Sequence, residues 1–216
     1  MAIRKIQKIS KPSLQRLPSY LHLLRDLQAT GVAWVSCTVI AEKLNKDPTQ
    51  VRKDIALTGI AGRPKVGYNL DELIRAILAY LNWDRPTDTF LIGAGNMGRA
   101  LLGYSGFGEH GLNIVAAFDA DSRVVGTTIH GRQVLPLSRF KPMAKEMKIT
   151  IGIITVPAAG AQGAADLMVD SGIQAIWNFA PARLRVPEHI VVENEDLSGS
   201  LAVLCRRLSR RSFPKK

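Results

Sequence analysis

The chain has 216 residues, 46% of them hydrophobic, and a formal net charge of +11. Its length favours two domains, and no apolar run approaches the roughly 18 residues of a membrane span. The N-terminus carries positive charge without a following apolar segment, which argues against a secretory signal and predicts a cytoplasmic protein. Cys37, Cys205 and the four scattered histidines have no disulfide or metal-ligand spacing, so we expect no metal site.

The positive charge is concentrated at the two ends of the chain. Residues 1–85 contain 14 lysines and arginines against 7 aspartates and glutamates, and residues 205–216 contain 6 against none. Residues 86–204 contain 9 against 11. This distribution favours binding of a polyanion by the N-terminal region. For the C-terminal tail, a solvated basic segment is an equally good interpretation.

The first predicted helix spans residues 14–29, where leucines recur at helical spacing. Gly31 follows this run and is expected to end the helix. Pro18 lies inside the window and predicts either a kink or the first turn of the helix.

Two short helices joined by a tight turn follow in the sequence. Ser36 is placed to cap a helix over 38–44, and Asp47 is placed to cap a second helix with Pro48 at its first position. Gln50 stands three residues after the Asp47 cap, as in a capping box. Helix, tight turn and helix form the helix-turn-helix pattern, whose second helix enters the major groove of DNA.

Polar side chains on the second helix suit contact with base edges and phosphates. The following segment, GRPKVGY over 62–68, fits a small β-wing, and Asn69 or Asp71 is placed to cap a last helix. An ordinary solvated face is the alternative interpretation, which the local charge excess disfavours. The candidate DNA-binding residues are Thr49, Gln50, Arg52, Lys53, Arg63, Lys65 and Tyr68.

Beyond a polar, proline-containing boundary at 82–88 the pattern changes to alternating strands and helices. Strands are predicted over 89–92, 114–118, 149–156, 175–177 and 190–192, with helices over 96–102 and 159–171. This alternation predicts an α/β fold, a Rossmann-like doubly wound parallel sheet, after an N-terminal winged helix-turn-helix domain.

A glycine-rich turn links the first of these strands to a helix. Gly93 permits a tight turn, Gly95 lets the backbone approach a pyrophosphate, and Gly98 permits close packing of helix on strand. The helix N-terminus favours phosphate. The candidate pyrophosphate-binding residues are Gly93, Ala94, Gly95, Asn96, Met97 and Gly98.

An acidic residue ends the second strand of the predicted sheet. Asp119 lies 26 residues after Gly93, and a carboxylate there would bind the ribose 2′-hydroxyl and favour NAD(H) over NADP(H). Asp121 is the second choice for this contact. The alternative is that either aspartate only caps the turn.

Two later loops follow predicted strands, where ligands bind in open parallel sheets. They are candidates to line a nicotinamide pocket through Val156, Pro157, Asn178, Phe179, Ala180 and Pro181, with Phe107 adding apolar surface. We find no His–Asp or Tyr–Lys pair placed for proton transfer beside a hydride. The cofactor is therefore expected to be a signal, so the protein is not expected to be an enzyme; alternatives are a small NAD-dependent oxidoreductase and a coenzyme A-binding regulator.

These segments together resemble the family of redox-sensing transcriptional repressors called Rex, over residues 13–204. The resemblance lies in the motifs LQRLPSYLHLL (14–24), QVRKD (50–54), VGYNLDELI (66–74), GAGNMGRAL (93–101), YSGF (104–107), FDAD (118–121), TVPAAGAQ (155–162), NFAPARL (178–184) and VVENEDL (191–197). It implies a homodimer that binds a palindromic operator and releases it when NADH binds.

The resemblance also implies roles for particular residues. Tyr104 and Phe107 would lie near the nicotinamide at the dimer interface, and Arg16 and Asp196 would form a redox-dependent ion pair between the domains. The C-terminal helix would reach the partner subunit. The expected domains are a winged-helix domain over 1–85, a Rossmann NAD(H)-binding domain over 86–196, and a dimerisation helix with basic tail over 197–216.

Overall fold

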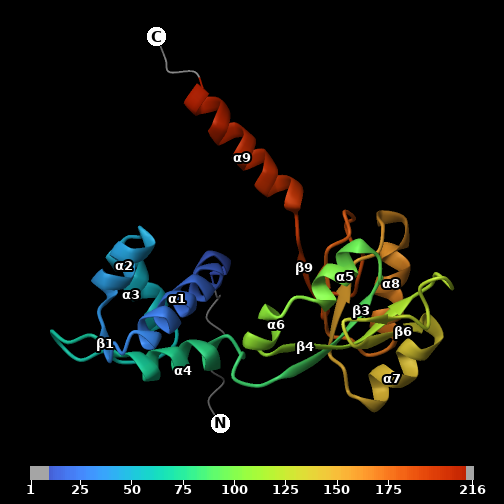
Figure 1. The fold of residues 1–216 in the computed structure, drawn as a ribbon, viewed down its shortest axis with the longest axis horizontal. Helices are drawn as coiled ribbons and strands as arrows, with labels where there is room; N and C mark the ends of the chain where they lie inside the picture. The colour runs from blue at the N-terminus through green and yellow to red at the C-terminus, as the bar shows by residue number, and fades with distance from the viewer. Residues whose placement is uncertain (1–9, 213–216) are drawn as a thin grey trace. The chain divides into compact units, whose positions relative to one another are not determined.

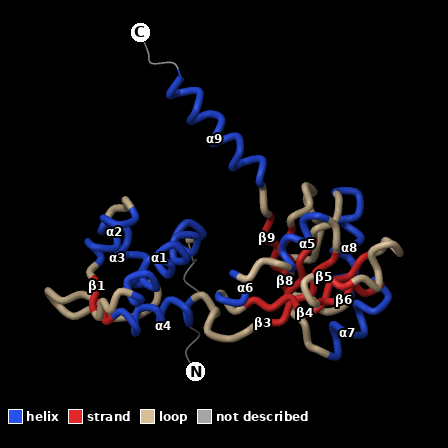
Figure 2. Tube along the Cα trace, viewed as in Figure 1, coloured by secondary structure: helices blue, strands red, loops and turns tan. Residues whose placement is uncertain are grey.

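The computed structural model describes residues 10–212, and the chain divides into two compact units, Met1–Arg85 and Pro86–Lys216. The division falls inside the polar segment at 82–88. Residues 213–216 of the predicted basic tail lie outside the described residues. Figures 1 and 2 show a mainly helical first unit and a second unit built on a sheet.

The N-terminal unit has the predicted winged helix-turn-helix architecture. Its elements are α1 (Lys11–Ala29), β1 (Trp34–Val35), α2 (Cys37–Leu44), α3 (Pro48–Ala56), β2 (Tyr68–Asn69) and α4 (Leu70–Tyr80). β1 pairs antiparallel with β2. The apolar faces of all four helices meet in one core, which includes Leu17, Leu21, Leu24, Ile40, Val51, Ile55, Leu73 and Ile77.

The predicted caps form around the helix-turn-helix. The Ser36 hydroxyl accepts the Val39 N–H at 3.2 Å, and the Asp47 carboxylate accepts the Gln50 N–H at 2.9 Å. Two expectations need correction. The side chain of Gln50 donates to Asp54 on its own helix, so the capping box is only half formed. α1 continues through Pro18, which is therefore not in its first turn.

The wing is a tight reversal at Arg63–Gly67, between the end of α3 and β2. The Arg63 N–H donates to the Gly67 carbonyl at 2.7 Å, and the Gly67 N–H returns a bond to the Arg63 carbonyl at 3.0 Å. The Arg63 guanidinium lies over the Trp34 ring, 4.6 Å from its centroid. This cation–π contact restricts the orientation of the Arg63 side chain on the wing.

The C-terminal unit contains the predicted parallel sheet, in the order β5-β6-β4-β3-β7-β8-β9. The strands are β3 (Thr87–Ile92), β4 (Leu112–Asp119), β5 (Thr128–Ile129), β6 (Arg132–Pro136), β7 (Ile151–Ile154), β8 (Ala175–Asn178) and β9 (Val191–Asn194). Only β5 runs antiparallel to its neighbour among these strands. The sequence did not predict the β5–β6 hairpin, because these strands are short and have no long apolar run.

Helices cover both faces of this sheet. The covering helices are α5 (Asn96–Leu102), α6 (Gly106–Glu109), α7 (Phe140–Glu146) and α8 (Ala158–Asp170). The last helix, α9 (Leu197–Ser212), follows β9 and contributes none of its described side chains to the sheet's core. Alternate residues of β3 point to opposite faces: Phe90 packs with α7 and α8, whereas Leu91 packs with α5. The doubly wound Rossmann-like fold is thereby confirmed.

A buried carboxylate on α3 connects that helix to α1. Asp54 is fully buried and accepts two bonds from Arg16, at 2.7 Å from Nε and 2.8 Å from Nη2. It also accepts the Tyr20 hydroxyl at 2.8 Å and the Gln50 amide at 2.9 Å. Arg16 and Tyr20 lie four residues apart on one face of α1. The network thus ties α3 to α1 through polar bonds inside the core.

This network changes the protonation behaviour of its members. Burial opposes ionisation of Asp54, but the hydrogen bonds from Arg16, Tyr20, Ser13 and Gln50 outweigh it and lower the pKa of its carboxyl. Burial, and then the bond to Asp54, raises the pKa of the Tyr20 hydroxyl to about 12. The ionised carboxylate and the protonated phenol are therefore both the stable forms at neutral pH.

The free energy of unfolding is expected to depend on pH at both extremes. Asp54 contributes stability above its unfolded pKa of about 3.9, and this is lost as pH falls through the lowered folded value. Tyr20 contributes stability below its unfolded pKa of about 10, and this is lost as pH rises toward 12. Tyr20→Phe should lower stability by about 1 kcal/mol at pH 7 and remove the alkaline loss. Urea unfolding across a pH series measures both; an unchanged alkaline slope in the variant would contradict the assignment.

Candidate nucleotide crevice and DNA-reading surface

The candidate nucleotide site lies at the carboxyl end of β3. The chain passes from β3 to β4 on one side and later returns to β7 on the other, so β3 stands at a topological switch point. The Gly93 N–H donates to the Phe118 carbonyl at 2.8 Å, and the Thr155 N–H donates to the Ile92 carbonyl at 2.9 Å. These bonds hold three strand ends at one edge of the sheet, where open α/β sheets bind ligands.

The three glycines have the geometry that their predicted roles require. Gly93 has φ +108°, and a Cβ there would lie 2.8 Å from the carbonyl carbon of Thr155. A Cβ at Gly98 would overlap the Gly93 carbonyl oxygen, so the helix can approach the strand only without a side chain. At Gly95 a Cβ would meet nothing within 4 Å. The turn is therefore closed at its first and last glycine and open at the middle one.

The remaining residues of the turn prepare the start of α5. Gly95 occupies the N-cap position without a side-chain cap, so the first N–H groups of the helix have no side-chain acceptor there. Asn96 is exposed and Met97 half-buried. Ala94 is buried, and its N–H donates to Asp119. The open backbone at 95–96 is the part of the turn available to a phosphate.

Asp119 lies directly against the glycine turn. One carboxylate oxygen accepts the Ala94 N–H at 2.6 Å, and the other accepts the Asp121 N–H at 2.9 Å. The alternative role of capping the turn is thus present, and the same bonds hold the carboxylate beside the predicted pyrophosphate site. Asp121 instead pairs with Arg123 at 2.7 Å, and that hydrogen bond lowers the pKa of Asp121 to about 2.

The loop after β8 is held by a buried amide. Asn178 donates to the carbonyls of Ala180 and Ala182 and to the Asn194 side chain, and it accepts the Ala180 N–H at 3.0 Å. Its side chain is therefore fully used in shaping the loop. The exposed Pro181 follows it, and at the end of β7 Val156 is half-buried and Pro157 exposed. Asn178 suits a supporting role for the pocket wall more than a direct side-chain contact.

A cavity of about 590 Å³ opens beside this loop. It is lined by Phe179, Ala180, Pro181, Ala182, Arg183, Asn194, Glu195, Asp196 and Ser198. Asp196 also begins α9, where its carboxylate accepts the Gly199 N–H at 3.0 Å. The loop predicted to frame a nicotinamide and the acid predicted to act as a switch thus line one cavity.

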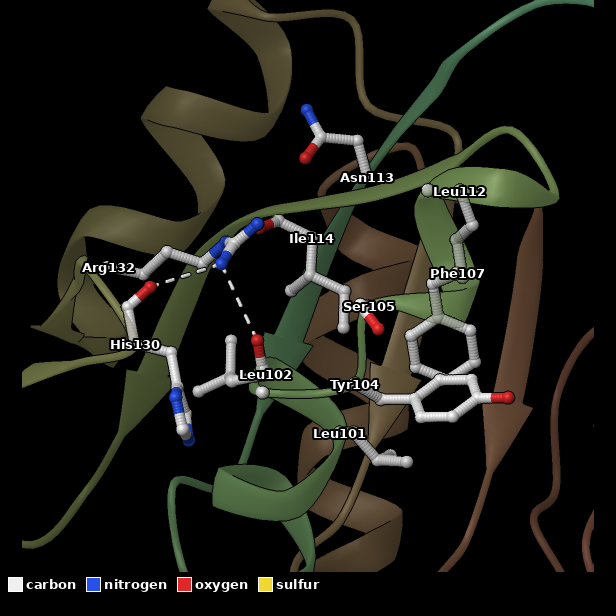
Figure 3. A pocket seen from close by; sticks show the side chains of 12 residues that line it. Leu101, Leu102, Tyr104, Ser105, Phe107, Leu112, Asn113, Ile114, His130 and Arg132 are labelled. Carbon is white, nitrogen blue, oxygen red and sulfur yellow. Dashed lines mark hydrogen bonds between the residues drawn. The ribbon is translucent and has the colours of Figure 1, made fainter.

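Four aromatic rings form a row near this loop. Ring centroids are 4.9 Å apart for Tyr104 and Phe107, 5.5 Å for Phe107 and Trp177, and 4.9 Å for Trp177 and Phe179. Figure 3 shows the Tyr104 and Phe107 rings side by side. The sequence analysis missed Trp177, although its position one residue before the Asn178 loop could have indicated it.

Tyr104 and Phe107 also line a second cavity, of about 260 Å³ (Figure 3). Its other wall is the β5–β6 hairpin, where Arg132 donates to the carbonyls of Ile114, Leu102 and His130. None of the residues of the glycine turn lines it. This cavity is therefore separate from the nucleotide crevice at the carboxyl ends of the strands.

The predicted DNA-binding residues gather on α3 and the wing. Thr49, Arg52 and Lys53 are exposed on α3, and Arg63 and Lys65 are exposed on the wing. Arg52 and residues 62–68, which end at the half-buried Tyr68, line one cavity of about 400 Å³. The structure therefore brings the cations of helix and wing together. Gln50 differs from the other α3 residues, because it is half-buried and bonded to Asp54.

The predicted ion pair between Arg16 and Asp196 joins residues of different units. Arg16 is bonded to Asp54 within the N-terminal unit, and Asp196 belongs to the C-terminal unit. The pair stays a prediction. Within residues 10–212, no group of three or more histidine, cysteine or acidic side chains is arranged to hold a metal, and no helix has the length and apolarity to span a membrane.

Alanine substitutions at Gly98, where there is no space for a side chain, and at Gly95, where there is, should affect stability differently. Gly98→Ala should lower the free energy of unfolding by about 3 kcal/mol, because the added methyl overlaps the Gly93 carbonyl, and should abolish NADH binding. Gly95→Ala should keep wild-type stability, because its site is open, yet weaken NADH binding. Thermal unfolding and fluorescence titration measure these effects. Wild-type affinity in Gly95→Ala would rule out this turn as the pyrophosphate site.

Two family models match the chain. A model described as "CoA binding domain" matches residues 84–182, and one described as "Putative DNA-binding protein N-terminus" matches residues 8–56. A curated relative from Treponema denticola, "Redox-sensing transcriptional repressor Rex", is 48% identical over 94% of this chain and 96% of its own length. The protein of the same name from Bacteroides thetaiotaomicron is 43% identical over 94% and 92%.

Solved structures agree with these matches. The crystal structure of RSP in complex with β-NAD⁺ and operator DNA has a TM-score of 0.88 and 34% identity, covering 95% of both chains. That of RSP in complex with β-NADH has a TM-score of 0.84 and 34% identity, covering 95% of this chain and 97% of that one. The chain therefore belongs to the Rex family of redox-sensing transcriptional repressors.

Proposed function

We propose that this chain acts in the cytoplasm as a homodimeric repressor that binds a palindromic operator and releases it when NADH occupies the crevice. The main support is the similarity, over 95% of both chains, to RSP bound to β-NAD⁺ and operator DNA, together with the match to the same protein bound to β-NADH. The proposal makes the nucleotide a signal and assigns no reaction to the protein.

The N-terminal unit supplies the DNA contact. Arg52 and Lys53 lie on the exposed side of the recognition helix, and Arg63 and Lys65 lie on the wing. The helix would enter the major groove while the wing contacts the adjacent backbone. The two N-terminal units of a dimer would bind half-sites about one helical turn apart. A change in the distance between these units would therefore remove the contact with one half-site.

The C-terminal unit supplies the nucleotide contacts. The pyrophosphate would lie on the open backbone at Gly95, and the adenosine ribose on Asp119. The nicotinamide would lie between Val156–Pro157 and the loop 178–181, near Tyr104 and Phe107. NAD⁺ and NADH differ by one positive charge and in ring planarity, so only the nicotinamide pocket can distinguish them.

The position of Asp196 suggests how ring occupancy reaches the DNA-binding unit. Asp196 lines the same cavity as Phe179 and Pro181, so a ring at that loop changes its surroundings. A pair between Asp196 and Arg16 would then connect the ring to α1. Coupling between two such sites is typically about 1–3 kcal/mol.

A second ligand has a specific observation in its favour. The match to the "CoA binding domain" model covers the same sheet, so coenzyme A is a competing occupant of the crevice. Asp119 favours the dinucleotide, because its carboxylate suits an unphosphorylated ribose and would repel the 3′-phosphate that coenzyme A carries on the adenosine ribose.

A mobility-shift titration on a palindromic probe tests the proposal. NAD⁺ should leave the shifted complex intact, NADH should weaken DNA affinity about 5- to 150-fold, and coenzyme A should have no effect. Arg52→Ala/Lys53→Ala should abolish the shift while NADH fluorescence titration stays normal, since both side chains are exposed on α3. DNA affinity that does not respond to NADH would overturn the sensing role, and a response to coenzyme A alone would favour the other ligand.

The proposed dimer has a candidate contact on α9. Leu201 is 59% exposed and Leu204 is 64% exposed, and their spacing of three residues puts them on one face of the helix. An apolar face of this kind is typical of a helix that packs on another chain. The family resemblance makes a second copy of this chain the expected partner.

Replacing the two leucines tests this contact. Leu201→Ser/Leu204→Ser should shift the protein from dimer to monomer in sedimentation velocity while each chain keeps its circular dichroism spectrum, because both side chains are exposed on the single chain. Val203→Ser removes a similarly exposed apolar side chain from another face and should leave the dimer intact. A double variant that remains dimeric would exclude docking through this face.

A further inference from the structure

The carboxylate of Asp54 is held by hydrogen bonds from Arg16, Tyr20 and Gln50. It is fully buried on the recognition helix α3, and Arg16 of α1 holds it with two bonds of 2.7 and 2.8 Å. Replacing a buried ion pair by apolar side chains is often neutral or stabilising, so its benefit is better sought in conformational specificity than in stability. The side chain that links this carboxylate to the DNA-reading residues is Gln50.

The bond between Gln50 and Asp54 fixes the direction of an amide. An ionised carboxylate only accepts hydrogen bonds, so the amide must offer an N–H to it, as it does at 2.9 Å. The reversed amide would set its carbonyl oxygen against the carboxylate. Asp54 stays ionised at neutral pH because Arg16 and Tyr20 donate to it. Gln50 therefore has its nitrogen directed inward, with the carbonyl oxygen and one N–H left to bond elsewhere.

Gln50 occupies the part of α3 from which base edges are read. It is the third residue of the helix, next to the exposed Thr49, and the N-terminal residues of a recognition helix contact the bases. A glutamine that offers one oxygen and one N–H matches adenine, which presents N6–H and N7 in the major groove. Guanine presents two acceptors, O6 and N7, and this amide cannot donate twice to it.

We propose that Asp54 is a positioning residue that fixes the amide of Gln50 and thereby sets a preference for adenine over guanine at one position of each half-site. This inference rests on the proposed operator binding. It assigns Asp54 no contact with DNA, because the residue is fully buried.

Selection from a DNA library with randomised half-sites, using the full chain, tests the inference. The wild type should prefer adenine at one position by roughly tenfold, as expected for a bidentate contact. Gln50→Ala should lose the preference there. Asp54→Asn should lose it at the same position, because an asparagine amide can accept as well as donate and no longer selects one orientation of Gln50.

Tyr20→Phe is the matched control. It removes another donor to the same carboxylate without touching the bond to Gln50, so it should change affinity for all sequences equally and leave the base profile unchanged. If Asp54→Asn does not fold, the double variant Arg16→Gln/Asp54→Asn replaces it in the same selection, because it removes both charges of the pair and leaves neither unpaired.

The outcomes separate the two proposals. A wild type that selects no sequence overturns operator binding and this inference together. A wild-type motif that Asp54→Asn leaves unchanged, or that Gln50→Ala leaves unchanged, overturns this inference alone. A Tyr20→Phe base profile that changes in the same way as that of Asp54→Asn also overturns it. Base preference would then depend on the stability of the core and not on the orientation of the Gln50 amide.

Discussion

The nucleotide crevice depends on a backbone-to-backbone contact at the end of β3. The first turn of α5 rests on the Gly93 carbonyl at Gly98, and Gly93 itself rests on the end of β7. Interiors are close-packed, so even one methyl group at such a contact forces strands or helix apart. The distance between the α5 N-terminus and the Thr155 loop follows from it, and with it the width of any ligand site between them.

The two units carry their charge differently, in keeping with their different proposed ligands. The N-terminal unit carries the excess of lysine and arginine that a phosphate backbone requires, and its exposed cations lie on α3 and the wing. Residues 86–204, which contain the sheet, are close to neutral, and the candidate site there consists of glycine backbone, short loops and aromatic rings. A dinucleotide needs few cations, because helix-terminal and turn N–H groups bind its phosphates. Each unit thus has the composition that its proposed ligand requires.

Local signals in the sequence were sufficient for the main elements and insufficient for contacts between them. Caps at Ser36 and Asp47 and the glycine spacing predicted the reading helices and the nucleotide turn, because each involves residues close in the chain. The bond between Arg16 and Asp54 spans 38 residues, and no local pattern indicates it. The β5–β6 hairpin was missed for another reason: strands of two and five residues leave too little periodicity to detect.

The start of α9 is anchored to β8, the strand that precedes the Asn178 loop. The Trp177 indole donates to the Glu195 carboxylate at 2.8 Å, and the Glu195 N–H donates to the Asn178 carbonyl at 2.9 Å. Both bonds end one residue before Asp196. Whatever direction α9 takes in an assembly, its point of departure is therefore fixed on β8. A displacement of the Asn178 loop would therefore also displace the first residues of that helix.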